Sequence, residues 1–192
     1  MAKRILLAGL AAGLVLYVWE SVAHLALPLG EAGISVFPNE PAMLTAIRQN
    51  VAENGFYFFP NPNPPNSTEE QKKQAMQSML TGPSGIMVVR PHGDPGMTPA
   101  RLGLQALFDI LSMIVAAVVL SQAAALKRFG PRVALVAMLS AIPTLRTELP
   151  QWNWYGFPAL YTTAQFALHA VGFILGGLVL AKMIKAAPEW PR

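Results

Sequence analysis

Long apolar runs alternate with one long polar stretch along this chain. A run of about 20 apolar residues is the length that crosses the hydrocarbon core of a bilayer as a helix. Four segments meet or approach that length, and we interpret them as transmembrane helices, over residues 1–27, 102–126, 132–149 and 156–182. The pattern therefore predicts a mainly α membrane protein built on a four-helix transmembrane bundle.

The last apolar run has the flanks of a membrane span. An amphipathic aromatic cluster of Trp152, Trp154 and Tyr155 comes before it, and Lys182 and Lys185 close it. Trp and Tyr favour the membrane–water interface, and Lys anchors a helix end at the headgroups. We interpret this order as interface belt, span and basic anchor.

The third run is the shortest and has two interpretations. Val133 to Leu145 is apolar and contains Pro143. It crosses the membrane only if Arg146 and Glu148 lie at the outer headgroups and Arg132 snorkels back to the other surface. A re-entrant hairpin is the alternative, but it would place the basic C-terminus outside.

The first run also has an alternative. Lys3 and Arg4 precede an apolar stretch, and Ser21–Ala23 resembles a signal-peptide cleavage site. We interpret the segment as a retained span, because about 22 residues suit a crossing better than a cleaved leader.

Residues 28–100 have a different composition and predict a small α+β cap between the first two spans. Asn39 and Pro41 favour one helix start, and Ser67 or Thr68 favours another. Short strands are predicted at 56–59 and 86–89, and the proline-rich stretch 60–66 excludes regular structure.

Charge gives the expected orientation. Hydrophobic residues make up 53% and charged residues only 12% of the chain, about half the charged share of a soluble domain. Most bases outside the cap flank the apolar runs at the ends predicted to be cytoplasmic. We therefore expect a bacterial inner-membrane protein with cytoplasmic N- and C-termini and a periplasmic cap. The net charge of +4 then reflects the positive-inside bias, so nucleic acid is not an expected partner.

Several polar side chains fall at a similar predicted depth in the outer leaflet. They are Glu20, His24, Asp109, Ser140, Thr162, Thr163 and Gln165, with Arg146 just above them. With 1.5 Å of rise per residue, Glu20 and Asp109 lie about 10 Å and Gln165 about 12 Å below the outer surface, and His24 lies near the outer end of its helix. One interpretation is a hydrogen-bonded knot in which Arg146 pairs with Glu20 or Asp109. The other is a site for a cation, a proton or a small polar ligand, because one arginine neutralises only one of two carboxylates.

The histidines and the missing cysteines limit the cofactors. His24 and His169 differ in predicted depth by about 15 Å, so we do not expect a bis-histidine haem. We interpret His169 as a hydrogen-bonded residue of helix packing, and His92 with Asp94 is too sparse a pattern to predict a metal. The chain has no cysteine, which excludes thiolate sites, and no nucleotide fingerprint or catalytic motif. We expect bound lipid and no intrinsic cofactor or metal.

Small residues on the first and last runs favour close helix packing. Gly9 and Gly13 form a GxxxG pattern, and Gly172, Gly176 and Gly177 lie on the last run. We expect these glycines to serve helix association, within the chain or with other membrane subunits or a second copy.

Motifs spread over nearly the whole length resemble a known group. They are Gly9-xxx-Gly13, Trp19-xxxx-His24, Leu27–Gly30, Pro38–Glu40, Gly55–Pro60 and, as the most specific, Trp152–Pro158. Together they resemble a group of uncharacterised bacterial four-span inner-membrane proteins with no assigned activity. The resemblance implies a bacterial origin and four spans, and it implies no catalytic residue.

These observations favour a non-enzymatic role. The leading hypothesis is an accessory or scaffolding subunit of a larger inner-membrane assembly. The alternative is a small transporter or binding protein for a cation, proton or small polar ligand that uses the intramembrane carboxylates. An enzyme acting on lipid or quinone is disfavoured, because no nucleophile and base are suitably spaced.

Overall fold

The structure, a computed structural model, describes residues 2–123 and 125–184. The chain forms two compact units: residues 1–34 with 97–192, and residues 35–96. We refer to the first as the membrane unit and to the second as the cap unit.

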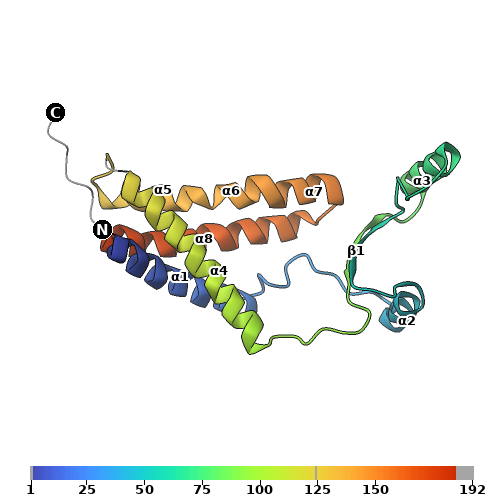
Figure 1. The fold of residues 1–192 in the computed structure, drawn as a ribbon, viewed down its shortest axis with the longest axis horizontal. Helices are drawn as coiled ribbons and strands as arrows, with labels where there is room; N and C mark the ends of the chain where they lie inside the picture. Colours follow the sequence, from blue (N-terminus) through green and yellow to red (C-terminus); the bar gives the residue numbers. More distant parts are fainter. Residues whose placement is uncertain (1, 124, 185–192) are drawn as a thin grey trace. The chain divides into compact units, whose positions relative to one another are not determined.

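Four helical rods make up the membrane unit (Figure 1). Three of them are the single helices α1 (Ala2–Leu25), α4 (Pro99–Gln122) and α8 (Ala159–Met183). The third rod in chain order is continuous but composite: α5 (Phe129–Leu139), α6 (Ala141–Pro143), the π-helical turn η1 (Thr144–Glu148) and α7 (Leu149–Tyr155). All four are long and apolar enough to cross a membrane, as the sequence predicts.

The rods turn small residues inward and large apolar residues outward. On α1, the buried residues include Ala8, Gly9, Ala12 and Gly13, whereas leucines such as Leu6 are half exposed. Such a surface would be unfavourable in water but is solvated by lipid tails, and small residues let helix backbones approach closely. This distribution supports lipid as the medium of the unit.

The rods pack in the order α4, α1, α8, α5. The main contacts are α4 with α1, α1 with α8, and α8 with α5. The shared core contains Leu16, Met113, Leu120, Val136 and Leu180, which are all less than 4% exposed. Thus α1 and α8 each have two main neighbours, and α4 also makes smaller contacts with α5 and α8.

The composite rod is longer than its sequence predicts. The expected span over 132–149 is part of a helix from Phe129 to Tyr155. Pro143 lies inside it, and a proline removes one helical hydrogen bond. The helix continues as a π-turn, in which the backbone N–H of Leu149 donates to the carbonyl of Thr144, five residues back. With 27 residues, the rod does not need the shortened crossing that the hydropathy pattern suggested.

The aromatic cluster belongs to this rod rather than to the start of the last one. Trp152, Trp154 and Tyr155 lie on α7, and Gly156 ends the helix with a φ of 71°. That left-handed conformation suits glycine, which closes many helices in this way. Since α8 begins at Ala159, the aromatic cluster ends the third candidate span and precedes the fourth.

Two arginines bind the end of α8. Arg4 Nε donates to the carbonyl of Met183 at 2.6 Å, and Arg132 Nη2 donates to the carbonyl of Ile184 at 2.8 Å. Arg132 is 3% exposed and also reaches the carbonyl of Leu126, so it does not snorkel as expected. The last carbonyls of a helix lack internal partners and carry partial negative charge, which explains the attraction.

The cap unit holds two helices and a two-stranded sheet. The order is α2 (Glu40–Asn50), β1 (Gly55–Phe59), α3 (Glu69–Thr81) and β2 (Gly85–Val89). Strands β1 and β2 pair antiparallel, with Tyr57 opposite Met87. Asn39 caps α2, and Thr68 caps α3 through a reciprocal capping box with Gln71, as these residue types favour.

Candidate functional site

Gln105 on α4 joins the two intramembrane carboxylates. Its Nε2 donates to Glu20 Oε2 and to Asp109 Oδ1, both at 3.0 Å. Glu20 comes from α1, so the amide connects two helices. The amide thus donates to both carboxyl groups and supplies no charge to either. We refer to Glu20, Gln105 and Asp109 as the carboxylate site.

Asp109 is the deeper of the two acids and is only partly satisfied. It is 4% exposed, and its Oδ2 has no hydrogen-bond partner among the described residues. Within the described part of the chain, neither Glu20 nor Asp109 forms an ion pair with a lysine or an arginine. A buried carboxylate without a partner is costly, so the site favours an added positive charge.

A cavity of about 300 Å³ opens beside Glu20 and Gln105. Tyr17 and His24 of α1 line it, together with Met97 and Leu102 near the start of α4. The Nδ1 of His24 lies 2.9 Å from the carbonyl of Glu20, so this histidine is held against its own helix. The cavity thus combines a carboxylate, an amide, an imidazole and the hydroxyl of Ser21 with the ring of Tyr17 and apolar walls.

A second pair lies on the other side of the unit. Glu148 in η1 is 6% exposed, and its Oε1 lies 3.0 Å from Nδ1 of His169 on α8. The two atoms are within ion-pair distance, but their angles do not make a hydrogen bond, and Glu148 Oε2 also lacks a partner among the described residues. Glu148 is therefore not an exposed acid but faces His169 inside the unit.

The single polar layer expected from helix depth is divided in two. Asp109 is joined through Gln105 to Glu20 on α1, whereas Glu148 faces His169 on α8, so the two acids belong to different contacts. Arg146 is exposed and forms no ion pair with Glu20 or Asp109 in the described structure. Gln165 is half-buried on α8 and makes no hydrogen bond to either acid there. Arg146 and Gln165 therefore do not belong to the carboxylate site.

The hydroxyls of the expected layer are satisfied locally. Ser140 donates to the carbonyl of Ala137, Thr162 to that of Pro158, and Thr163 to that of Ala159. Serine and threonine in helices commonly bond a carbonyl of the preceding turn. These residues therefore contribute no polar group to the carboxylates.

The glycines lie at close helix contacts. A Cβ on Gly9 would lie 2.8 Å from Cα of Ile114, and one on Gly13 would lie 2.4 Å from Cα of Ile110. On α8, an added Cβ would approach Leu16 at Gly172, Met113 at Gly176 and Val136 at Gly177. Each of the five thus makes room for a neighbouring rod of the same chain.

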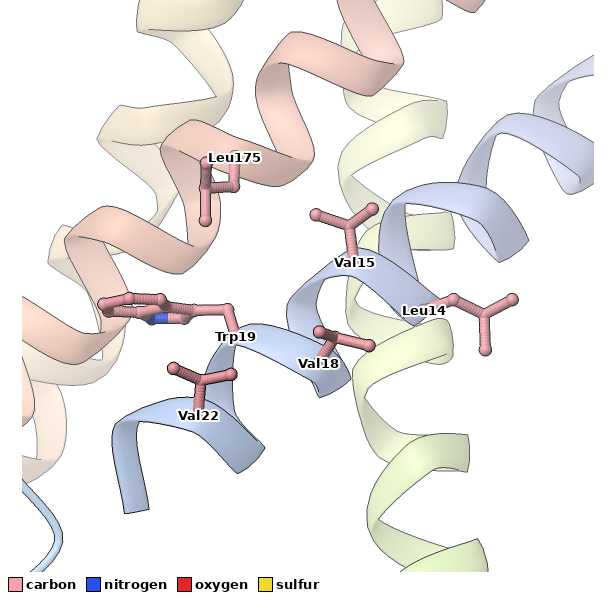
Figure 2. Close-up of a pocket in the computed structure, with 6 residues that line it drawn as sticks. All are labelled: Leu14, Val15, Val18, Trp19, Val22 and Leu175. Atoms are coloured by element: carbon pink, nitrogen blue, oxygen red, sulfur yellow. The ribbon is translucent and has the colours of Figure 1, made fainter. Parts of the chain in front are cut away.

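An apolar groove follows the surface of α1 beside α8. Figure 2 shows its lining: Leu14, Val15, Val18, Trp19 and Val22 of α1, with Leu175 of α8. The indole of Trp19 extends toward α8, where its Nε1 donates to the carbonyl of Leu168 at 2.9 Å. The only polar atom of these side chains is thus already bonded, and the groove offers apolar contact alone.

The remaining histidine is engaged in the cap unit. His92 Nε2 lies 3.2 Å from the carbonyl of Ala52, and Asp94 pairs with Arg90. The described residues contain no group of three or more His, Asp or Glu side chains that could hold a metal ion. The side chains of His92 and Asp94 therefore make structural contacts within the cap unit.

Sequence reasoning missed Gln105 and the partner of Glu148. Gln105 precedes Asp109 by four residues, a spacing that places both on one helix face, so the signal was present. Glu148 was placed at the surface because the apolar run ends at Leu145. The π-turn, which carries the helix onward, leaves no clear mark in the sequence.

No protein-family model, curated protein or solved structure matches this chain.

Proposed function

We propose that this protein is a small integral membrane binding protein or transporter for a cation, a class that includes the proton, and that the carboxylate site is where the cation binds. The observation that carries the proposal is the bridge of Gln105 between Glu20 and Asp109. This bridge brings two acids together in an apolar unit and supplies no positive charge.

The charge balance favours a cation over a purely structural knot. A knot would be complete if a basic side chain neutralised both acids, but the donor that joins them is a neutral amide, and the neighbouring imidazole of His24 lies against the backbone carbonyl of Glu20. Either one acid carries a proton or a cation enters, and both states are cation binding in the broad sense. The cavity beside Glu20 gives such a cation a route to the site.

Flux through vesicles tests this proposal. We expect purified protein in liposomes to move protons, sodium or an organic cation down an imposed gradient, and Asp109→Asn to abolish the movement. Glu31→Gln is the matched control, because Glu31 is an exposed acid of the membrane unit outside the carboxylate site. If no cation moves and none binds to the wild-type protein in detergent, the proposal is wrong.

An accessory or scaffolding role in a larger inner-membrane assembly is the second candidate. It rests on the sheet of the cap unit, where Phe56 is 61% and Val88 is 71% exposed and the two lie opposite each other in the β1–β2 register. An exposed apolar pair of this kind often marks a contact surface. After mild solubilisation, a stoichiometric membrane subunit or a second copy should then remain bound. The double substitution Phe56→Ser with Val88→Thr should release this partner.

The proposed setting is the bacterial inner membrane, with both termini cytoplasmic and residues 28–100 in the periplasm. Support comes from the basic residues at the ends of the rods and from the even number of candidate spans. Reporter fusions after Lys185 and within 127–132 should report the same side, opposite to a reporter placed within 60–66. Opposite sides for the first two fusions would contradict this orientation.

A further inference from the structure

The cavity beside the carboxylate site has the chemistry of a receptor for an organic ammonium ion. We propose that it binds an ammonium group attached to an apolar body, with Glu20 facing the charge and Tyr17, Met97 and Leu102 facing the body. The proposal rests on the proposed function and names the class of cation.

The polar end of the cavity suits a single positive charge. Glu20 lines it, and its Oε1 accepts no hydrogen bond from the described residues, while Oε2 is taken by Gln105. Asp109, joined to the same amide, adds negative charge one helical turn deeper. Among the described lining residues none is a lysine or an arginine.

The donor set fits an ammonium ion better than a bare metal ion. Metal ions such as calcium and magnesium need about six oxygen ligands. Here Gln105 presents its N–H groups to the carboxylates, so its amide protons occupy oxygen atoms that a metal would use. An ammonium ion needs only a nearby negative charge and is stabilised further by an aromatic ring, which Tyr17 brings to the lining.

The remaining walls suit an apolar body. Leu25, Met97 and Leu102 lie around the opening and are 72%, 74% and 42% exposed. A volume of about 300 Å³ is at the lower end of the range for small-molecule sites. Because it exceeds the volume of a hydrated metal ion, a phenyl or short alkyl group can enter with the charge. Methionine sulfur also packs well against aromatic rings.

Benzyltrimethylammonium is a suitable probe, because its charge is fixed and its ring is small. We expect it to bind the full-length protein in neutral maltoside micelles by calorimetry, and Glu20→Gln to weaken binding at least about tenfold through loss of the nearest charge. Met97→Ala should weaken benzyltrimethylammonium more than tetramethylammonium, which lacks the ring. Glu31→Gln should leave both affinities unchanged.

Neutral and lipid probes complete the test. Neopentylbenzene, which has the same shape without the charge, should not compete with the probe. Phosphatidylethanolamine added to the micelles distinguishes two sources of the ammonium group: competition indicates a lipid headgroup, and its absence indicates a free amine.

The inference is overturned if benzyltrimethylammonium does not bind, if Glu20→Gln binds it as well as the wild type, or if neopentylbenzene competes equally. Binding or flux of protons or sodium without benzyltrimethylammonium binding overturns this inference alone. Absence of every cation overturns the proposed function as well. Unfolding midpoints of each variant separate a loss of binding from a loss of fold.

Discussion

At the scale of single residues, glycine sets the distance between helices. Gly9 and Gly13 bring α1 against the backbone of Ile114 and Ile110 on α4, and this contact positions Glu20 and Gln105 for their bond. The backbone cannot give way as the end of a long side chain can. The close helix contact is therefore a precondition of the carboxylate site.

Gly13→Ala should consequently destabilise the protein by about 1–3 kcal/mol, the usual cost of overpacking a tight contact. Gly103→Ala is the control, because it lies on α4 with no atom within 4 Å of an added Cβ. There a methyl group should leave stability unchanged or raise it slightly. The measurement is unfolding in detergent, and equal effects at the two positions would refute the role of Gly13 at the close contact between α1 and α4.

The pair of Glu148 and His169 is also a matter of single residues. His169→Asn should cost about 1–3 kcal/mol, because it removes the polar group that faces the buried Glu148 carboxyl group. Glu148→Gln added to it should recover most of that loss. A double-mutant cycle measures the coupling, and simple additivity of the two changes would show that the side chains do not interact.

At the scale of elements, the π-turn decides the length of the third crossing. A π-turn holds one more residue than an α-turn, so it absorbs the change of helix phase around Pro143. It also brings Glu148 inward. The sequence showed only an apolar run that stops early, because a hydropathy pattern reports composition and not hydrogen-bond spacing.

Single deletions can reveal this role. Removal of Leu145 from the π-turn should convert it to an ordinary α-turn and keep α5 and α7 in phase. Removal of Met138 from α5 should instead rotate every later residue of the rod by about 100°. Both side chains face lipid, at 62% and 70% exposure, so they form a matched pair. The Met138 deletion should lower the unfolding midpoint much more, and equal losses would contradict the role assigned to η1.

At the scale of the whole molecule, the packing order determines which polar groups meet. Four spans, the cap helices and the two strands could be predicted, because length, capping residues and proline positions act locally. The order of the rods could not, since it depends on which small-residue faces fit together, and so Arg146 and Gln165 were expected beside acids that they do not reach.

This order predicts how substitutions combine. Asp109→Asn and Glu148→Gln lie in separate contacts, so their effects on stability should add within about 0.5 kcal/mol. Glu20→Gln and Asp109→Asn share Gln105 and should depart clearly from additivity. The measurement is the free energy of unfolding of the single and double variants in one detergent. Strong coupling between Asp109 and Glu148 would show that the polar groups act as one layer.

The two arginines at the end of α8 also bear on how the protein is made. The carbonyls of Met183 and Ile184 are synthesised after both Arg4 and Arg132, which belong to the first and third rods. Until the fourth rod is made, Arg4 therefore lacks its acceptor, and Arg132 has only the carbonyl of Leu126. A ribosome that stops within α8 would release three inserted rods with Arg4 unbound and Arg132 half-bound, and we expect membrane proteases to remove such chains faster than the finished protein.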